Sequence, residues 1–164
     1  MSPVIRTIGQ ADWAAWEPLF KAYIDFYQTS IPTEQYQKTF DRLVDPQTDL
    51  YGLVMTDEQD QSKLLAIAHY FPRQTPWSEK KVMHLNGPFF LAFLDLQHEL
   101  IQDLFVSPDA RSKGYGRMMI QAVEKHARDM DCLHLGWATN HGNPARKLYD
   151  QMGKCDFVEY RIKF

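Results

Sequence analysis

The sequence predicts a mixed α/β fold with one central sheet, two helices early in the chain and two strand–helix units late in it. The first observation is an apolar run at residues 100–106 that enters a polar turn with two glycines, which opens directly into an amphipathic helical pattern at residues 117–130. The second is a series of aromatic residues between positions 13 and 27 that recur every three or four residues, as on one helix face. The third is a set of short apolar runs bounded by polar turns, which indicates strands.

The first elements follow from alternation and then from helical spacing. Residues 4–8 alternate in polarity and predict a strand. The next segment predicts a helix, with an apolar face formed by Trp13, Trp16, Phe20, Tyr23 and Tyr27. A second helix starts at Pro32 and ends before Pro46, because a residue that precedes proline disfavours the helical conformation.

The middle of the chain predicts two strands and then a long connection. Residues 50–55 and 64–71 have the apolar character of strands, and the polar residues 57–62 predict the turn between them. Residues 73–99 predict a long connection that holds a strand or a short helix. This connection includes an apolar patch at residues 89–94.

The last third contains the two strand–helix units. A strand at residues 100–106 precedes the helix at residues 117–130, and a strand at residues 133–138 precedes a short helix at residues 144–152. The alternating residues 156–164 predict a final strand.

Bulk composition predicts a single domain over residues 1–164, which is long enough to bury a core without disulfides or metal. The net charge of −3 argues against a dedicated nucleic-acid binder. The first residues lack the apolar core of a signal peptide, and the longest apolar run, residues 88–94, is too short to span a bilayer. Cys132 and Cys155 predict free thiols, and no metal-ligand spacing is present. We therefore expect a cytoplasmic protein that binds no nucleic acid, membrane or metal.

The glycine turn (residues 111–116) has the features of an anion site. The first amides of the helix that follows have no partner inside it and carry the positive end of its dipole. Arg111, Lys113 and Arg117 add positive charge, while Gly114 and Gly116 allow the backbone to approach an anion closely. The turn lacks the ending of a Walker loop and the third glycine of a dinucleotide fingerprint. It therefore predicts a site for a diphosphate, with an ordinary tight turn as the alternative.

Three elements together resemble the GNAT superfamily of acetyl-CoA-dependent N-acetyltransferases. They are Arg111-x-x-Gly114-x-Gly116 after Asp103-Leu-Phe-Val, the strand containing Trp137, and Asn143-Pro-Ala-Arg-Lys-Leu-Tyr149-Asp-Gln-Met-Gly153. The resemblance covers most of the chain. It implies a single domain with a central, mostly antiparallel sheet flanked by about four helices. The early helix, with Trp16, Tyr23, Phe26 and Tyr27, and the later Leu43-Val-Asp-Pro46 resemble the branch that acetylates diamines, polyamines and other small amines.

The same resemblance implies how acetyl-CoA is held. The strand formed by Leu104, Phe105 and Val106 would pair with the pantetheine arm. The diphosphate would lie on the amides and charges of Arg111, Ser112, Lys113, Gly114, Tyr115, Gly116 and Arg117. Asn143 and Tyr149 would flank the thioester. Asn143 precedes Tyr149 by six residues where seven are usual in the family, so Asn140 is an alternative.

Acetyl transfer needs an acid, an oxyanion donor and a base. Tyr149 is the expected acid, because a phenol is protonated at neutral pH and this tyrosine faces the cofactor sulfur in the family; half-buried packing is its alternative role. A backbone N–H near Val106 would bind the oxyanion. Gln102-Asp103 stands where polyamine acetyltransferases have Glu-Asp. Either Asp103 accepts the amine proton, or water carries it toward Glu34, Asp25 or His69; capping of nearby backbone is an equal alternative for Asp103.

The acceptor site is the least determined part of the sequence. Trp16, Tyr27 and Trp77 are candidates to line it and to hold an ammonium group by cation–π attraction, with core packing as the alternative for the tryptophans. Residues 81–97 form a longer connection than in relatives, which predicts a cover for the acceptor site, an oligomer contact or a surface excursion. The tail at residues 160–164 is expected to join a homodimer, as in related proteins.

The resulting hypothesis is an N-acetyltransferase that moves an acetyl group from acetyl-CoA to a small primary amine such as a polyamine, a diamine or an amino acid. Acetylation of protein lysines is one alternative. A non-catalytic CoA-binding protein is another, because Gln102 cannot take a proton at neutral pH.

Overall fold

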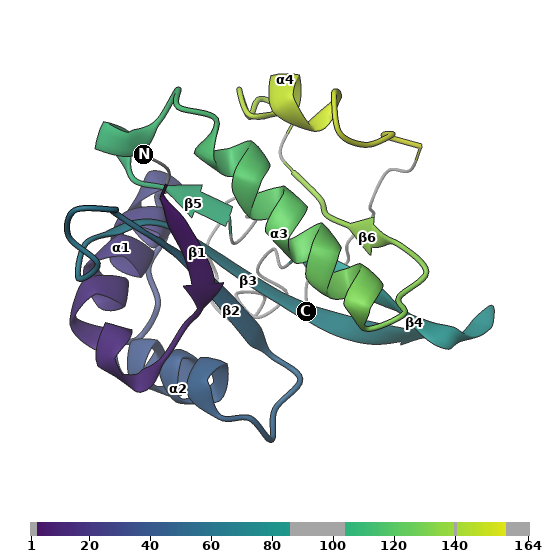
Figure 1. The fold of residues 1–164 in the computed structure, drawn as a ribbon, viewed down its shortest axis with the longest axis horizontal. Coiled ribbons are helices and arrows are strands. Elements are labelled where there is room, and N and C mark those ends of the chain that lie inside the picture. Colours follow the sequence, from purple (N-terminus) through teal and green to yellow (C-terminus); the bar gives the residue numbers. More distant parts are fainter. Residues whose placement is uncertain (1–2, 86–103, 140, 157–164) are drawn as a thin grey trace.

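The computed structural model describes residues 3–85, 104–139 and 141–156 and arranges them in three layers (Figure 1). The strands are β1 (Val4–Thr7), β2 (Tyr51–Thr56), β3 (Leu64–Thr75), β4 (Ser78–Leu85), β5 (Leu104–Val106) and β6 (Leu135–Gly136). The α-helices are α1 (Trp13–Phe26), α2 (Thr33–Val44), α3 (Tyr115–Asp129) and α4 (Arg146–Tyr149). Two 3-10 turns, Gln10–Asp12 and Pro108–Ala110, precede α1 and the glycine turn.

The six strands form one sheet in the order β1-β2-β3-β4-β6, with β5 also paired to β3. Every described pairing is antiparallel except that of β4 with β6, which is parallel. The predicted mixed α/β fold, with a mostly antiparallel sheet and four α-helices, is confirmed.

Each face of the sheet has its own core because side chains alternate along the strands. Val54, Ile67 and Phe105 face α1 and α2, where the aromatic face predicted for α1 is buried. Ala66 and Ala68 face the other side, where the apolar stripe of α3 packs against the sheet. The sheet is therefore covered by α1 and α2 on one face and by α3 on the other (Figure 1).

The connection predicted at residues 73–99 contains a strand, one of the two elements expected inside it, but the connection begins later than predicted because β3 is longer than residues 64–71. β3 continues to Thr75, and the chain turns at once into β4, which pairs back along β3. The first half of β4 is polar and only partly buried, which is why the sequence alone left a strand and a short helix as alternatives in this segment. The rest of this segment, with the apolar patch at residues 89–94, lies outside the described residues.

Both β4 and β5 pair with the same strand, β3, in register. Leu85, the last residue of β4, lies opposite Tyr70, while Leu104, the first residue of β5, lies opposite Ala68. Only the position opposite His69 separates the two strands along β3. β4 and β5 therefore lie end to end along the same edge of β3.

Two late elements are shorter than predicted. β6 covers two residues of the predicted strand at 133–138, and α4 covers four residues of the predicted helix at 144–152. The final strand predicted at residues 156–164 lies outside the described residues from position 157 onward.

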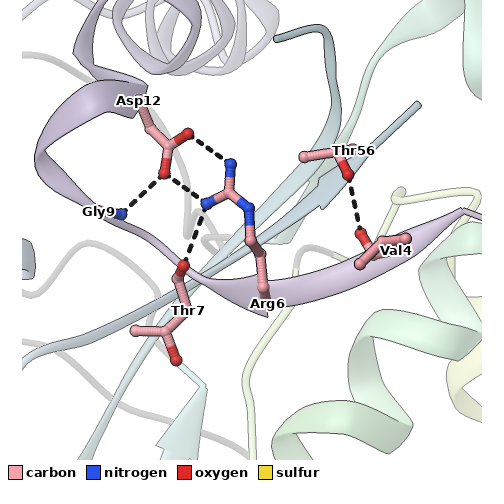
Figure 2. A network of polar contacts seen from close by, with 6 residues as sticks. All are labelled: Val4, Arg6, Thr7, Gly9, Asp12 and Thr56. Carbon is pink, nitrogen blue, oxygen red and sulfur yellow. Dashed lines mark hydrogen bonds and ion pairs between the residues drawn. The ribbon is translucent and has the colours of Figure 1, made fainter. Parts of the chain in front are cut away.

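An ion pair joins β1 to the start of α1 (Figure 2). Both terminal nitrogens of Arg6 donate to the carboxylate of Asp12 at 2.7 Å, and the Gly9 amide donates to the same carboxylate at 2.8 Å. Asp12 is buried, and the hydrogen bonds from Arg6 are the main cause that lowers the pKa of its carboxyl below the ordinary value. This contact sets where the chain leaves β1 and enters the helix.

We expect Asp12→Asn to lower the free energy of unfolding by about 1–2 kcal/mol at pH 7, since the amide loses two charge-assisted hydrogen bonds. A carboxyl whose folded pKa is depressed stabilises the fold above its unfolded pKa of about 3.9 and loses that contribution as the pH falls through the folded value. Denaturant titrations at pH 7 and between about pH 5 and 2 measure this difference. The difference in free energy of unfolding between the wild type and Asp12→Asn should shrink at acid pH. Asp41→Asn, a change at an exposed carboxylate on α2, should show no such difference. A difference that is constant with pH would contradict the assignment.

Candidate active site

The glycine turn has the backbone of an anion site. Ser112 and Gly114 are both left-handed, with φ of 63° and 80°, and the residue between them is not. Such alternation gathers successive N–H groups around a concavity. No side chain caps the first turn of α3 among the described residues, so its amides remain available. A Cβ built on Gly114 would meet no atom within 4 Å, so this glycine is required by its φ and not by crowding.

Gly116 has a different role from the one predicted. A Cβ at this position would lie 3.3 Å from Cδ2 of Leu148, a residue of α4. Gly116 therefore lets the start of α3 approach α4, the helix that carries Tyr149. This packing role adds to the expectation that Gly116 allows an anion to approach the backbone, which stays a prediction.

α4 is fixed at both ends by polar contacts. At its start, Asn143 Oδ1 accepts from the Ala145 amide, and Asn143 Nδ2 donates to Oγ1 of Thr139, both at 2.9 Å. Just past its end, the guanidinium of Arg117 donates to Oε1 of Gln151. Asn143 is thus engaged in capping α4 with both ends of its amide, and Arg117 ties α3 to α4. Asn140, the alternative to Asn143, lies outside the described residues.

Tyr149 lies between these supports with 9% of its surface exposed. Its ring packs edge-on against Trp137, with the centroids 5.7 Å apart. Burial raises the pKa of the Tyr149 phenol above its ordinary value, and the neighbouring phenol of Tyr27 raises it further. The phenols of Tyr149 and Tyr27, which are far apart in the sequence, therefore interact electrostatically in the folded chain, and the raised pKa keeps the proton on Tyr149 at neutral pH.

The exposed edge of β5 directs backbone groups away from the rest of the sheet. The Ser107 amide donates to the Leu65 carbonyl at 2.9 Å, and the register places Val106 opposite Ala66. Hydrogen-bonded and non-bonded pairs alternate in an antiparallel ladder, so Leu104 and Val106 direct their N–H and C=O groups away from β3. Among the described strands none pairs with this edge, so it can accept an extended ligand that carries amides.

The other predicted residues are not all part of this site. Trp16 is fully buried, stacks on Phe20 and donates from Nε1 to Nε2 of His69 at 3.0 Å, so both Trp16 and His69 belong to the core. Trp77 is 91% exposed at the tip of the β3–β4 hairpin, about 20 Å along β3 from the residues that pair with β5. Core packing, the alternative considered for Trp16, is thus what the structure shows for Trp16 and His69, while Trp77 lies away from the described site. Gln102 and Asp103 lie outside the described residues.

The family follows from the match of this chain to known proteins. Residues 16–154 match the model of the acetyltransferase (GNAT) family. The chain belongs to the GNAT acetyltransferase family. A D-amino-acid N-acetyltransferase of Saccharomyces cerevisiae is 31% identical over 160 residues, which cover 96% of this chain and 89% of that protein. An L-ornithine N5-acetyltransferase of Arabidopsis thaliana is 33% identical over 76 residues, which cover 46% of this chain and 33% of that protein.

Solved GNAT structures share the fold at low identity. The structure of AAC(6')-Iy with the bisubstrate analogue CoA-S-monomethyl-acetylneamine superposes with a TM-score of 0.74 at 15% identity, over 100% of this chain and 99% of that one. The protein is thus an acyltransferase of the GNAT type. Acetyl-CoA is the donor that the GNAT family uses.

Two contacts of this GNAT site were missed in the sequence. Gln151 bonds to Arg117 across 34 positions, and no local pattern marks such a pair. The Asn143 cap, by contrast, has a recognisable signal, because Asn-Pro commonly starts a turn. In the part of the chain that the structure describes, no cluster of side chains suits a metal ion, and no helix is both long and apolar enough to cross a membrane.

Proposed function

We propose that this GNAT acetyltransferase transfers the acetyl group of acetyl-CoA to a primary amine of a small molecule, by direct attack in a ternary complex. The observation that carries the proposal is the position of Tyr149. A buried phenol that keeps its proton is packed on α4, which the Gly116–Leu148 contact holds against the amide-rich start of α3. This arrangement combines an anion site with a proton donor.

The described residues suit the parts of acetyl-CoA, which supplies the acetyl group as a reactive thioester. The amides of the glycine turn and the charge of Lys113 suit a diphosphate. The outward N–H and C=O groups of Leu104 and the outward N–H of Val106 suit the amides of a pantetheine arm. A backbone N–H on the same edge is the candidate donor to the oxyanion that forms when the amine attacks.

Tyr149 acts at the end of the reaction. Its raised pKa keeps the phenol protonated throughout the neutral range, so Oη can donate a hydrogen bond or a proton to a departing thiolate. Tyr27, whose phenol interacts electrostatically with that of Tyr149, is then a wall of the acceptor site together with Phe26, the last residue of α1. Such aromatic faces favour a cationic amine.

The substrate class is supported by the relatives. The yeast protein is a D-amino-acid N-acetyltransferase and the Arabidopsis protein an L-ornithine N5-acetyltransferase, so both take small amines. We infer an amino acid, diamine or polyamine as the acceptor here. Gln102 favours a second candidate, a CoA-binding protein without catalysis, since the residue there lacks the carboxylate of polyamine acetyltransferases.

Release of CoA thiol from acetyl-CoA tests the function. The acceptors are a diamine, a polyamine, L- and D-amino acids and a lysine-rich peptide, and calorimetry with CoA measures cofactor binding separately. We expect at least one small amine to accelerate thiol release, with the peptide inactive. Preference for the peptide would replace the small-molecule proposal by protein acetylation. CoA binding without acceleration by any amine would favour the non-catalytic candidate.

A further inference from the structure

Arg111 does not direct its charge at the glycine turn. Its Nε–H donates to the carbonyl of Val106 at 3.2 Å. Its guanidinium carbon lies 5.2 Å from the ring centre of Phe26 and 5.5 Å from that of Phe105. The side chain therefore joins the end of β5 to the last residue of α1.

The carbonyl that Arg111 holds is one of the outward groups of β5. Val106 is the last residue of that strand, and its C=O is directed away from β3. A hydrogen bond from Nε fixes the peptide plane between Val106 and Ser107. It thereby fixes the edge that we propose to face the cofactor.

The aromatic contact of Arg111 leads to the acceptor side of the site. The Phe26 side chain is 48% exposed, and the Arg111 guanidinium packs over its ring. This contact therefore helps to hold the ring in place. The Phe26 ring packs edge-on against Tyr27 with the centroids 4.9 Å apart, and the phenol of Tyr27 interacts electrostatically with that of Tyr149. A shift of Phe26 would therefore reach the two phenols.

We propose that Arg111 is a positioning residue for acetyl transfer, which holds the end of β5 against the end of α1, and that its side chain is not a ligand of the diphosphate. This inference rests on the proposed function for the expected changes in kcat/KM, whereas the contact between Arg111 and Phe26 does not depend on it. The planar guanidinium can stack on two rings while Nε donates to a carbonyl. A lysine keeps the charge but cannot make both contacts.

The matched variants are Arg111→Lys, Arg111→Met, Phe26→Leu and the double variant Phe26→Leu/Arg111→Lys, with Lys113→Met as the phosphate control. We expect Arg111→Lys and Arg111→Met to lower kcat/KM for the amine alike, by about tenfold, with the Kd for CoA changed less than about threefold. Phe26→Leu should have a similar effect, and the double variant should add little to either single change. Lys113→Met should instead raise the Kd for CoA and reduce its dependence on salt.

If Arg111 instead bound the diphosphate through its charge, the variants would show the opposite pattern of effects. If Arg111→Lys behaves as the wild type, while Arg111→Met raises the Kd for CoA and lowers its salt dependence, the positioning role is overturned. Strictly additive effects of Phe26→Leu and Arg111→Lys on kcat/KM and on the unfolding midpoint would also overturn it. A wild-type protein that binds no CoA would refute the proposed function alone, because coupling between Phe26 and Arg111 in the unfolding midpoint still tests the contact.

Discussion

Tyr149→Phe is expected to lower the turnover of acetyl-CoA with amine by about 10²- to 10³-fold, the range typical of a lost general acid. The variant keeps the ring against Trp137 and removes only the hydroxyl, so the fold and the affinity for CoA should be retained. Because burial raises the pKa of this phenol above its ordinary value, its ionisation should produce no fall in wild-type turnover below about pH 10. Steady-state kinetics across the pH range, with CoA binding by calorimetry, measures both effects.

Tyr70→Phe is the matched control for this change. Tyr70 is also buried, and its hydroxyl bonds to Nδ1 of His126 at 2.8 Å on the α3 face of the sheet. Removal of that hydroxyl should lower stability by about 1 kcal/mol and leave kcat unchanged. Equal turnover in Tyr149→Phe and the wild type would remove Tyr149 from the mechanism.

Gly114→Val is expected to raise the Kd for CoA by about 10- to 100-fold. A β-branched residue at φ of 80° carries strain of about 1–3 kcal/mol, which the glycine turn can relieve by rotating its amides away from the ligand. No neighbouring atom lies within 4 Å of the added Cβ, so no clash adds to this strain and any loss of stability should not exceed it. Calorimetric titration with CoA, and thermal unfolding without it, separate the two effects.

Gly114→Asn provides the comparison, because asparagine tolerates the left-handed conformation better than other residues. It should keep the Kd for CoA within about fivefold of the wild type. If Gly114→Asn and Gly114→Val weaken binding equally, the backbone conformation at this position is not what binds the anion.

Much of the fold could be predicted because its helices are amphipathic. The spacing of Trp16, Phe20 and Tyr23 marked the buried face of α1 correctly. The same spacing could not tell a core residue from one that lines a pocket. Trp16 has its partner, His69, 53 positions away, and no local pattern reports such a contact.

The candidate site was predictable where its residues are local. The glycine turn was recognised from its residues, and Tyr149 from the resemblance of residues 143–153 to the family pattern. Its neighbour Tyr27 is reached only through the packing of the folded chain. The hydrogen bonds of Asn143 to Thr139 and to the Ala145 amide were not predicted, because local sequence does not distinguish an asparagine that caps a short helix from one that meets a ligand.

The register of β4 and β5 predicts that the chain can be shortened between these two strands. Eighteen residues lie between Leu85 and Leu104, yet one position along β3 separates the two strands. Removal of residues 86–101 would join Leu85 to Gln102-Asp103, and two residues opposite one partner make a β-bulge. We expect this minimal enzyme to unfold cooperatively and to bind CoA as the full chain does, as measured by calorimetry and thermal unfolding. Its failure to fold would mean that the inserted residues are needed to complete the sheet; its success would make this junction a place to graft foreign sequence.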